Sequence, residues 1–137
     1  MKLKVRVLSV DREVLNTEAE AIVAHAPDGE FTLLPNHIPV IVPLKIEKVE
    51  LLGAASAGDK NQPLAVHGGV LRTDGKEVLI LTEAAELPEE IDKERALAAK
   101  ERAERRIAQA KISEEIDLTR AEAALMRALL RLKMTHH

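Results

Sequence analysis

Residues 81–106 read LTEAAELPEEIDKERALAAKERAERR, and the character of the chain changes in the middle of this stretch. All six glycines and all six prolines of the 137-residue chain lie at or before Pro88, and the 49 residues after it contain neither. Those residues are mainly Ala, Leu, Glu, Lys and Arg, which favour helix. The stretch therefore predicts a boundary at Pro88, with a β domain over residues 1–87 and a helical domain over residues 88–137.

The first domain carries short runs in which apolar and polar residues alternate, as in strands with one buried face. Eight short runs predict strands, at residues 3–9, 19–24, 31–34, 40–42, 46–52, 64–66, 70–72 and 78–82, and the runs at 3–9 and 46–52 alternate in this way. Pro39 and Pro43 flank the fourth run and restrict it to the edge of a sheet. Asp-Gly within residues 73–76 predicts a hairpin turn. Strands spaced this closely favour a small antiparallel sandwich or barrel.

The second domain predicts two helices joined by a short break. Residues 91–110 form the first helix, and Pro88 with the acidic residues after it suits a helix start. Ser113 is a good N-cap for a second helix over residues 114–132. Two helices with so short a connection form an antiparallel hairpin, so the fold class is α+β.

Small side chains follow one face of each predicted helix. These seam positions are Ala96, Ala99, Ala103, Ile107 and Ala110, and Ala121, Ala124, Leu125, Ala128 and Leu132. An alanine seam buries little apolar area, so it stabilises a hairpin weakly, as a moving part would require. The alternative is an ordinary amphipathic hairpin docked permanently on the sheet, which composition alone favours.

Composition and charge exclude several classes of protein. Phe31 is the one aromatic residue, so a ring-stacking surface for single-stranded nucleic acid is absent. There is no cysteine, which excludes disulfides, cysteine zinc sites and thiol nucleophiles. The net charge is −3, with −6 in residues 1–90 and +3 in residues 91–137, so no nucleic-acid partner is expected. No apolar run is long enough to span a bilayer, and the alternating start predicts a strand rather than a signal peptide.

A search for catalytic patterns finds no active site. Residues 53–58, GAASAG, have the glycine spacing of a phosphate loop, but Asp59 follows where lysine is required. His25, His37 and His67 are isolated and lack metal-ligand spacing, which indicates surface or edge residues. None of the three serines lies in a nucleophile elbow. Hydrolytic or redox chemistry is therefore not expected.

Arginine is concentrated on the two helices in matching rows. Arg95, Arg102 and Arg106 are separated by 7 and 4 residues, and Arg120, Arg127 and Arg131 repeat this spacing. Two such rows on one side would form a pocket for an anion, because guanidinium groups suit phosphate oxygens. The alternative is a solvated helix surface with ion pairs such as Glu101–Arg105 and Glu104–Lys100.

Four stretches in the same order carry a resemblance to a known family. They are GEFTLLPNHIPVIVPL (29–44), LAVHGGVLRTDGKEVLILTEAAE (64–86), IDKERALAAKERAERR (91–106) and IDLTRAEAALMRALLRL (116–132). The chain resembles, over essentially its whole length, the epsilon subunit of bacterial F-type ATP synthase, and most of all members from thermophilic bacilli. It departs from the family at Phe31-Thr32, where Leu-Gly is common.

The resemblance implies a ten-stranded N-terminal β sandwich and a C-terminal helical hairpin. It implies a non-catalytic central-stalk subunit that couples rotation to catalysis, with the gamma subunit, the membrane c-ring and the catalytic alpha and beta subunits as partners. The hairpin would lie down on the sandwich or extend up into the catalytic head, where it inhibits ATP hydrolysis. The implied location is the cytoplasmic face of the bacterial membrane, which the subunit meets only through the complex.

Some members of this family bind ATP on the lowered hairpin through the motif I/L-D-x-x-R-A. Residues 91–96 match it fully, and residues 116–121 match it again but are not the aligned copy. The resemblance implies ATP as a regulatory ligand, with or without Mg²⁺, at Glu86, Asp92, Arg95, Arg102, Arg127 and Arg131. The base could not stack on a ring, because the hairpin has no aromatic residue. A stand-alone nucleotide-sensing adaptor is the alternative function, and a small hydrolase is a distant third.

Overall fold

A computed structural model describes residues 1–112 and 117–135. The chain divides into two compact units, Met1–Leu87 and Pro88–His137, here called the sandwich unit and the hairpin unit. The strands of the sandwich unit are β1 (Leu3–Leu8), β2 (Glu13–Ala19), β3 (Ala21–Ala26), β4 (Gly29–Leu33), β5 (Val40–Ala54), β6 (Lys60–Thr73), β7 (Glu77–Leu81) and β8 (Ala85–Glu86), with the short 3-10 helix η1 (Ala55–Ala57) between β5 and β6. The hairpin unit has the 3-10 helix η2 (Pro88–Glu90), α1 (Lys93–Ala110) and α2 (Leu118–Met134).

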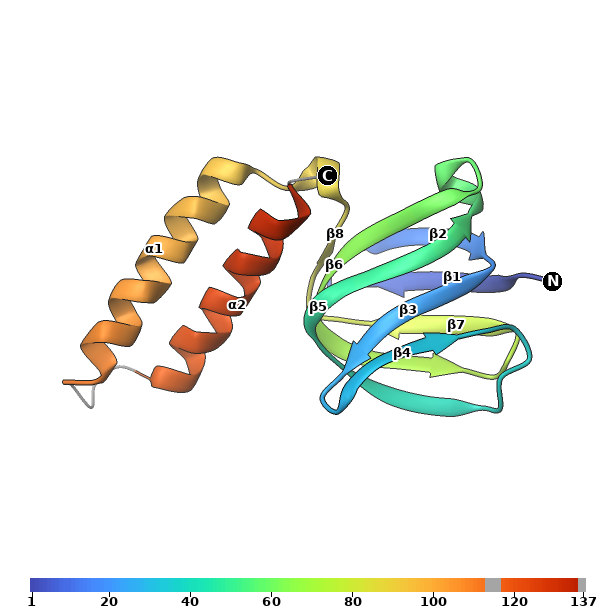
Figure 1. Ribbon diagram of the computed structural model, residues 1–137, viewed down its shortest axis with the longest axis horizontal. Helices are drawn as coiled ribbons and strands as arrows, with labels where there is room; N and C mark the ends of the chain where they lie inside the picture. The colour runs from blue at the N-terminus through green and yellow to red at the C-terminus, as the bar shows by residue number, and fades with distance from the viewer. Residues whose placement is uncertain (113–116, 136–137) are drawn as a thin grey trace. The chain divides into compact units, whose positions relative to one another are not determined.

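The long strands β5 and β6 bend and belong to both layers of the sandwich (Figure 1). The sheet order is β2-β1-β7-β6-β5-β3-β4, with β8 paired to β6. Residues 40–44 pair with 69–73 in the layer that contains β1, β2 and β7, and residues 46–54 pair with 60–67 in the layer of β3, β4 and β8. When β5 and β6 are each counted as two segments, one in each layer, the described strands number ten, as the family resemblance implies.

Two glycines mark the bend of β6. Gly68 and Gly69 have φ values of 80° and 123°, in the region that favours glycine. A Cβ atom at Gly69 would lie 2.0 Å from the carbonyl oxygen of Leu81 in β7. Only glycine therefore allows the strand to turn this closely past its neighbour.

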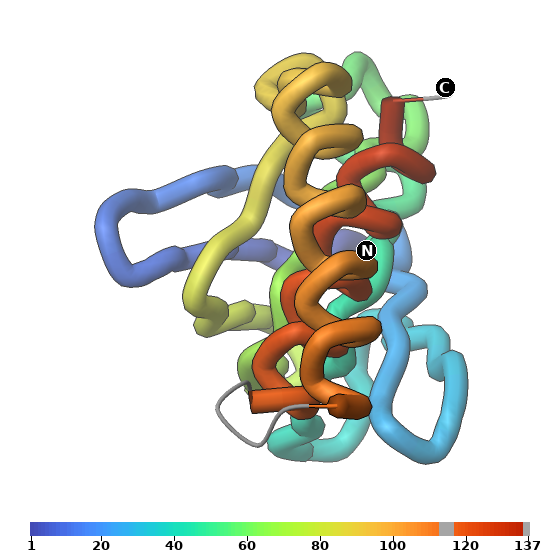
Figure 2. The backbone as a smooth tube through the Cα atoms, turned by 90° about the vertical axis from the view of Figure 1, so that its left-hand side faces the viewer, coloured from blue at the N-terminus to red at the C-terminus, as the bar shows by residue number. Residues whose placement is uncertain are grey.

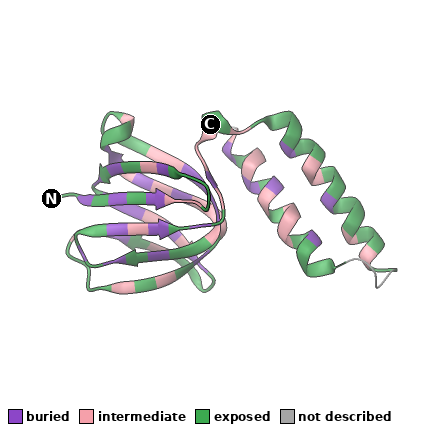
Figure 3. Ribbon diagram, turned by 180° about the vertical axis from the view of Figure 1, so that it is seen from behind, coloured by how far each residue is buried: buried purple, intermediate pink, exposed green. Residues whose placement is uncertain are grey.

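The core of the sandwich unit is aliphatic and continuous between the layers. Burial alternates along the strands (Figure 3), and Leu3, Val5 and Val7 of β1 are fully buried. They belong to one cluster with Leu51 and other residues from both layers. Phe31, the one aromatic residue, is partly buried against this cluster.

Helices α1 and α2 run antiparallel, side by side (Figures 1 and 2). The fully buried described residues are few: Ala96 and Ala103 on α1, and Ala121, Ala128, Leu130 and Met134 on α2. All ten predicted seam positions are buried or half-buried. Neither helix, in the part that the structure describes, is apolar enough over a sufficient length to cross a bilayer.

The structure differs from the sequence predictions in several elements. It adds β2 and β8, and it joins the runs at 40–42 and 46–52 into β5 and those at 64–66 and 70–72 into β6. Strands β1 and β7 pair in parallel, so the sandwich is not wholly antiparallel. Helix α1 begins at Lys93 rather than at residue 91. Ser113 and residues 114–116, the predicted start of the second helix, lie outside the described residues.

Candidate functional site

The aspartate of the first I-D-x-x-R-A motif starts helix α1. Asp92 has extended backbone angles, and its Oδ1 accepts a hydrogen bond from the backbone N–H of Arg95 at 3.2 Å. This is an N-cap, which satisfies an otherwise unpaired donor of the first turn. Ala96, the last residue of the motif, is 2% exposed. The motif therefore has a structural role in addition to the ligand role that the resemblance implies.

The second copy of the motif does the same for helix α2. Asp117 Oδ1 accepts from the backbone N–H of Arg120 at 3.1 Å, and Ala121 is 4% exposed. In both copies the aspartate caps, the alanine is buried and the arginine side chain is exposed. A match to I-D-x-x-R-A is thus first of all the signature of a helix start on this hairpin.

The predicted carboxylate Glu86 lies on β8 in the sandwich unit and is bound to a histidine. Its Oε1 is 2.9 Å from Nε2 of His67, whose side chain is 1% exposed. His67 Nδ1 is buried and makes no hydrogen bond among the described residues. The sequence interpretation of His67 as an isolated surface or edge residue is therefore wrong. His67 is a buried residue of β6, 5% exposed, although it is not a member of the aliphatic core cluster.

The four predicted arginines are all accessible to solvent. Arg95 and Arg102 on α1 are exposed, and Arg127 and Arg131 on α2 are half-buried. The side chains of Arg95, Arg102 and Arg127 have no hydrogen-bond or ion-pair partner among the described residues. The ion pairs Glu101–Arg105 and Glu104–Lys100, named as an alternative from the sequence, are not formed among the described residues either. Exposed pairs of this kind contribute little, at about 0.3–0.5 kcal/mol each.

A groove on the hairpin unit gathers a different set of arginines. It has a volume of about 630 Å³ and is lined by Arg106, Gln109, Asp117, Arg120, Ala121, Ala124 and Arg127. Among the predicted site residues, Arg127 lines it. The sequence had placed Arg106 and Arg120 in its two arginine rows, but the family resemblance did not carry them into the site. The 7-and-4 spacing was therefore the signal that could have found them.

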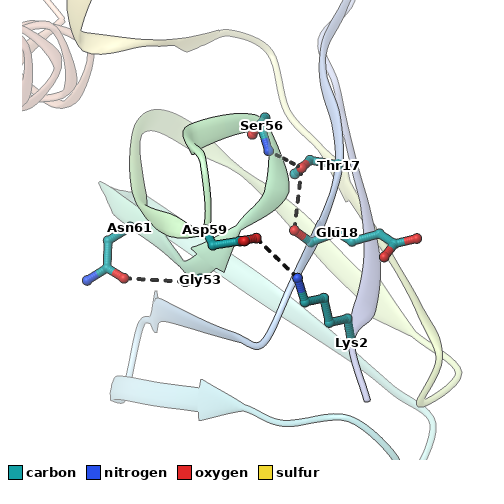
Figure 4. Close-up of polar contacts among 7 residues, drawn as sticks. All are labelled: Lys2, Thr17, Glu18, Gly53, Ser56, Asp59 and Asn61. Carbon is teal, nitrogen blue, oxygen red and sulfur yellow. Dashed lines mark hydrogen bonds and ion pairs between the residues drawn. The ribbon is translucent and has the colours of Figure 1, made fainter.

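In the loop that resembles a phosphate loop, residues 53–58, backbone N–H groups that could bind phosphate are already hydrogen-bonded within the protein (Figure 4). Three backbone N–H groups of residues 53–58 already donate within the protein: Gly53 to Asn61 Oδ1 (3.4 Å), Ser56 to Thr17 Oγ1 (2.9 Å) and Gly58 to the carbonyl of Ala55 (3.2 Å). A strand, β6, follows at Lys60 where a phosphate loop requires a helix. The sequence-based rejection of this loop agrees with its structure.

Comparison with known proteins assigns both halves of the chain to one family. Residues 2–88 match the β-sandwich domain, and residues 89–135 the long α-helix domain, of the ATP synthase delta/epsilon chain. The ATP synthase epsilon chain of Brevibacillus brevis is 43% identical over 108 residues, covering 79% of this chain and 80% of the relative. That of Anoxybacillus flavithermus is 46% identical over 109 residues, covering 80% and 78%.

A solved structure shows the same fold. A chain in the cryo-EM structure of the Euglena gracilis mitochondrial ATP synthase (OSCP, F1 and c-ring) matches with a TM-score of 0.79 and 24% identity. The match covers 99% of this chain and 82% of that one. The two-layer strand arrangement and the hairpin are therefore shared with a component of a rotary complex.

Proposed function

The chain belongs to the ATP synthase epsilon family, and we propose that it couples rotation to catalysis in the central stalk and restrains ATP hydrolysis through its helical hairpin. It is a non-catalytic subunit of the synthase. The observation that best supports a moving hairpin is the size of its buried side chains. Four alanines account for most of its fully buried described positions, at residues 96, 103, 121 and 128. Small side chains hold helices with little apolar area, so rearrangement costs little.

The proposed regulatory ligand is ATP, bound when the hairpin is in its lowered state. Glu86, Asp92, Arg95, Arg102, Arg127 and Arg131 would hold it, with or without Mg²⁺. The guanidinium groups of Arg95, Arg102 and Arg127 have no ion-pair partner among the described residues, so they are available to phosphate oxygens. ATP would shift the hairpin toward the lowered state only by its difference in affinity for the two states.

The proposed partners are the gamma subunit and the c-ring for the sandwich unit, and the alpha and beta subunits for the raised hairpin. Large apolar side chains stand exposed around the loop after β4: Leu34 is 57% exposed, Ile38 is 74% and Ile41 is 68%. Exposed apolar groups this close together suit a protein interface. Through these partners the subunit would lie at the cytoplasmic face of the bacterial membrane.

Deletion of residues 88–137 from the assembled synthase tests the inhibitory role. We expect the truncated complex to hydrolyse ATP faster than the intact complex, since the sandwich unit retains its own core. Co-purification of the gamma subunit and the catalytic subunits serves as the control for assembly. An unchanged ATPase rate in a fully assembled complex would contradict inhibition by this hairpin.

Calorimetric titration of the isolated chain with ATP tests the ligand. Arg95→Ala should weaken binding, because it removes a guanidinium that has no structural partner. Asp92→Ala removes both the carboxylate and the helix cap, so Asp92→Ser is the better variant because serine also caps helices. If both Arg95→Ala and Asp92→Ser bound ATP as tightly as the unmodified chain, the assignment of the ATP site would be wrong.

A further inference from the structure

The groove of the hairpin unit is built around the second copy of the motif. Asp117, Arg120 and Ala121 of that copy line it, together with Ala124 and Arg127 farther along α2. Successive spacings of 3, 1, 3 and 3 residues place them along one face of the helix. Arg106 and Gln109 of α1 form the opposite wall. The alanines leave the floor open, and the long side chains stand around it.

The described residues that line the groove carry an excess of positive charge. Arg106 and Arg120 are exposed and Arg127 is half-buried, and none of the three side chains has a partner among the described residues. Asp117 is the one carboxylate among the described lining residues, and its Oδ1 accepts a hydrogen bond from the backbone N–H of Arg120. Three guanidinium groups therefore face one carboxylate that is engaged in capping.

We propose that this groove is a binding site for a linear phosphate chain, held by Arg106, Arg120 and Arg127. Guanidinium groups bind phosphate oxygens in pairs, with both charge and geometry matched. Arg120 and Arg127 lie seven residues apart, about 10.5 Å along a helix, so the cations form a row rather than a point. A row of cations suits a chain of phosphates better than a single phosphate ion.

The site differs from the proposed ATP site, with which it shares only Arg127. The backbone N–H of Arg120 is already taken by Asp117, so the guanidinium groups rather than the helix start carry the binding. Gln109 adds an amide donor on the α1 side. The groove, at about 630 Å³, suits a small anion rather than the flat acidic surface of a protein. The phosphate chain could be inorganic or the tail of a nucleoside triphosphate.

Titration of the full chain with inorganic tripolyphosphate, at low ionic strength, tests the site. Arg120→Gln should lower the affinity about tenfold, the effect of losing one charge-assisted contact. Arg105→Gln is the matched control, since it removes the same charge from an exposed residue of the hairpin that does not line the groove. We expect it to change the affinity less than about twofold, through long-range charge alone. Equal losses in the two variants would overturn the proposal, as would the absence of binding by the unmodified chain.

A second variant tests the shape of the site without changing its charge. Ala124→Leu fills the floor of the groove at a half-buried position and should also lower the affinity, with helicity by circular dichroism unchanged. Retained affinity in a folded Ala124→Leu chain would contradict binding in the groove. Binding of a polyglutamate peptide in place of tripolyphosphate would contradict the phosphate assignment.

Parallel titration with ATP separates the two sources and the two sites. If a nucleotide tail is the natural ligand, Arg120→Gln weakens ATP and tripolyphosphate alike. If an inorganic chain is the ligand, only tripolyphosphate binding falls. Arg95→Ala should leave tripolyphosphate binding intact. If Arg95→Ala abolished tripolyphosphate binding, the tripolyphosphate would bind in the proposed ATP site, and the proposal of a separate site in the groove would be wrong. If the unmodified chain bound tripolyphosphate but not ATP, the proposed ATP site would be contradicted and the groove site would not.

Discussion

The sandwich unit and the hairpin unit bury different kinds of side chain. In the sandwich unit, the core is mainly leucine, isoleucine and valine from both layers, with Leu3, Leu51, Leu71 and Ile80 fully buried. In the hairpin unit, most of the fully buried described residues are alanines. A leucine side chain contributes about 1.5–3 kcal/mol on burial, and alanine has only a methyl group to contribute.

This difference separates a scaffold from an adjustable part. The strands of the sandwich unit are fixed by a continuous core and by backbone pairing in two layers. The helices depend on a seam of small residues and on the aspartate caps at their starts. We therefore expect substitutions in the sandwich unit to have the larger effects on stability, and substitutions in the hairpin unit to change helicity or ligand binding at lower cost.

The largest effect is expected at the bend of β6. Gly69→Ala places a Cβ atom 2.0 Å from the carbonyl oxygen of Leu81, so the strand or its neighbour must move. We expect a loss of more than about 4 kcal/mol in the free energy of unfolding, enough to prevent stable folding of the sandwich unit. The measurement is urea denaturation followed by methyl NMR signals, because the chain has no tryptophan or tyrosine for fluorescence.

Gly68→Ala is the matched control for that substitution. Gly68 also has a positive φ, but the nearest atom to its added Cβ lies at 3.8 Å. Its cost should be limited to the backbone strain, about 1–2 kcal/mol. Equal losses at the two glycines would show that the close approach of β7 is not what requires Gly69.

Leu51→Ala tests the aliphatic core itself. Leu51 lies on β5, is fully buried and pairs with Ile22 of β3. The truncation should cost about 3 kcal/mol, the sum of lost burial and a cavity. Helix signals of the hairpin unit should remain, since Leu51 belongs to the other unit. A loss below about 1 kcal/mol would mean that the core is less tightly packed than its burial indicates.

The fold could be predicted from the sequence where the pattern is local. The hairpin seam followed from 3.6-residue periodicity, and the turn at residues 73–76 followed from Asp-Gly. Strand β2 was missed because its two large apolar residues, Val14 and Leu15, are adjacent instead of alternating, and its other core-side residues, Thr17 and Ala19, are weak apolar signals. The parallel pairing of β1 with β7 joins segments about seventy residues apart, so no local pattern could reveal it.

The candidate site was less accessible to sequence reasoning. Arginine spacing indicated two rows, but spacing on single helices does not show which rows face a common groove. The structure brings Arg106, Arg120 and Arg127 together across the two helices. The His67–Glu86 contact was also missed, because the two residues are 19 apart and meet only through the pairing of β6 with β8.

Ala103→Leu tests the seam of the hairpin unit. Ala103 is 2% exposed on α1, so a larger side chain must push neighbouring groups apart. Overpacking of this kind should destabilise the hairpin by about 2 kcal/mol. Thermal melting of the helix signal at 222 nm measures it, with Ala108→Leu at an exposed position of the same helix as the control. A stabilised hairpin in Ala103→Leu would indicate a seam with spare volume.

The two caps offer a smaller and symmetric test. Asp92→Ala and Asp117→Ala each remove the acceptor for a backbone N–H of the first turn, and each should cost about 1 kcal/mol of helix stability. The serine variants at the same positions should recover most of the loss, since serine caps equally well. The melting temperature of the helix signal is the readout. An alanine variant that melts like the unmodified chain would remove the structural role of the motif.

The smallest effect concerns how the free energy of unfolding of the sandwich unit falls at acidic pH. Hydrogen bonds from the backbone N–H of Glu77, at 2.8 Å, and of Lys76, at 2.9 Å, hold the pKa of Asp74 below its ordinary value of 3.8. A lowered folded pKa gives stability that is present above pH 3.8 and lost as the pH falls through the folded pKa. Asp74→Asn should therefore reduce the loss of stability in this acidic range. Urea midpoints measured between neutral pH and pH 2 test this, with Asp28→Asn in another exposed turn as control. The same acid dependence in Asp74→Asn and the unmodified chain would show that this turn does not contribute to it.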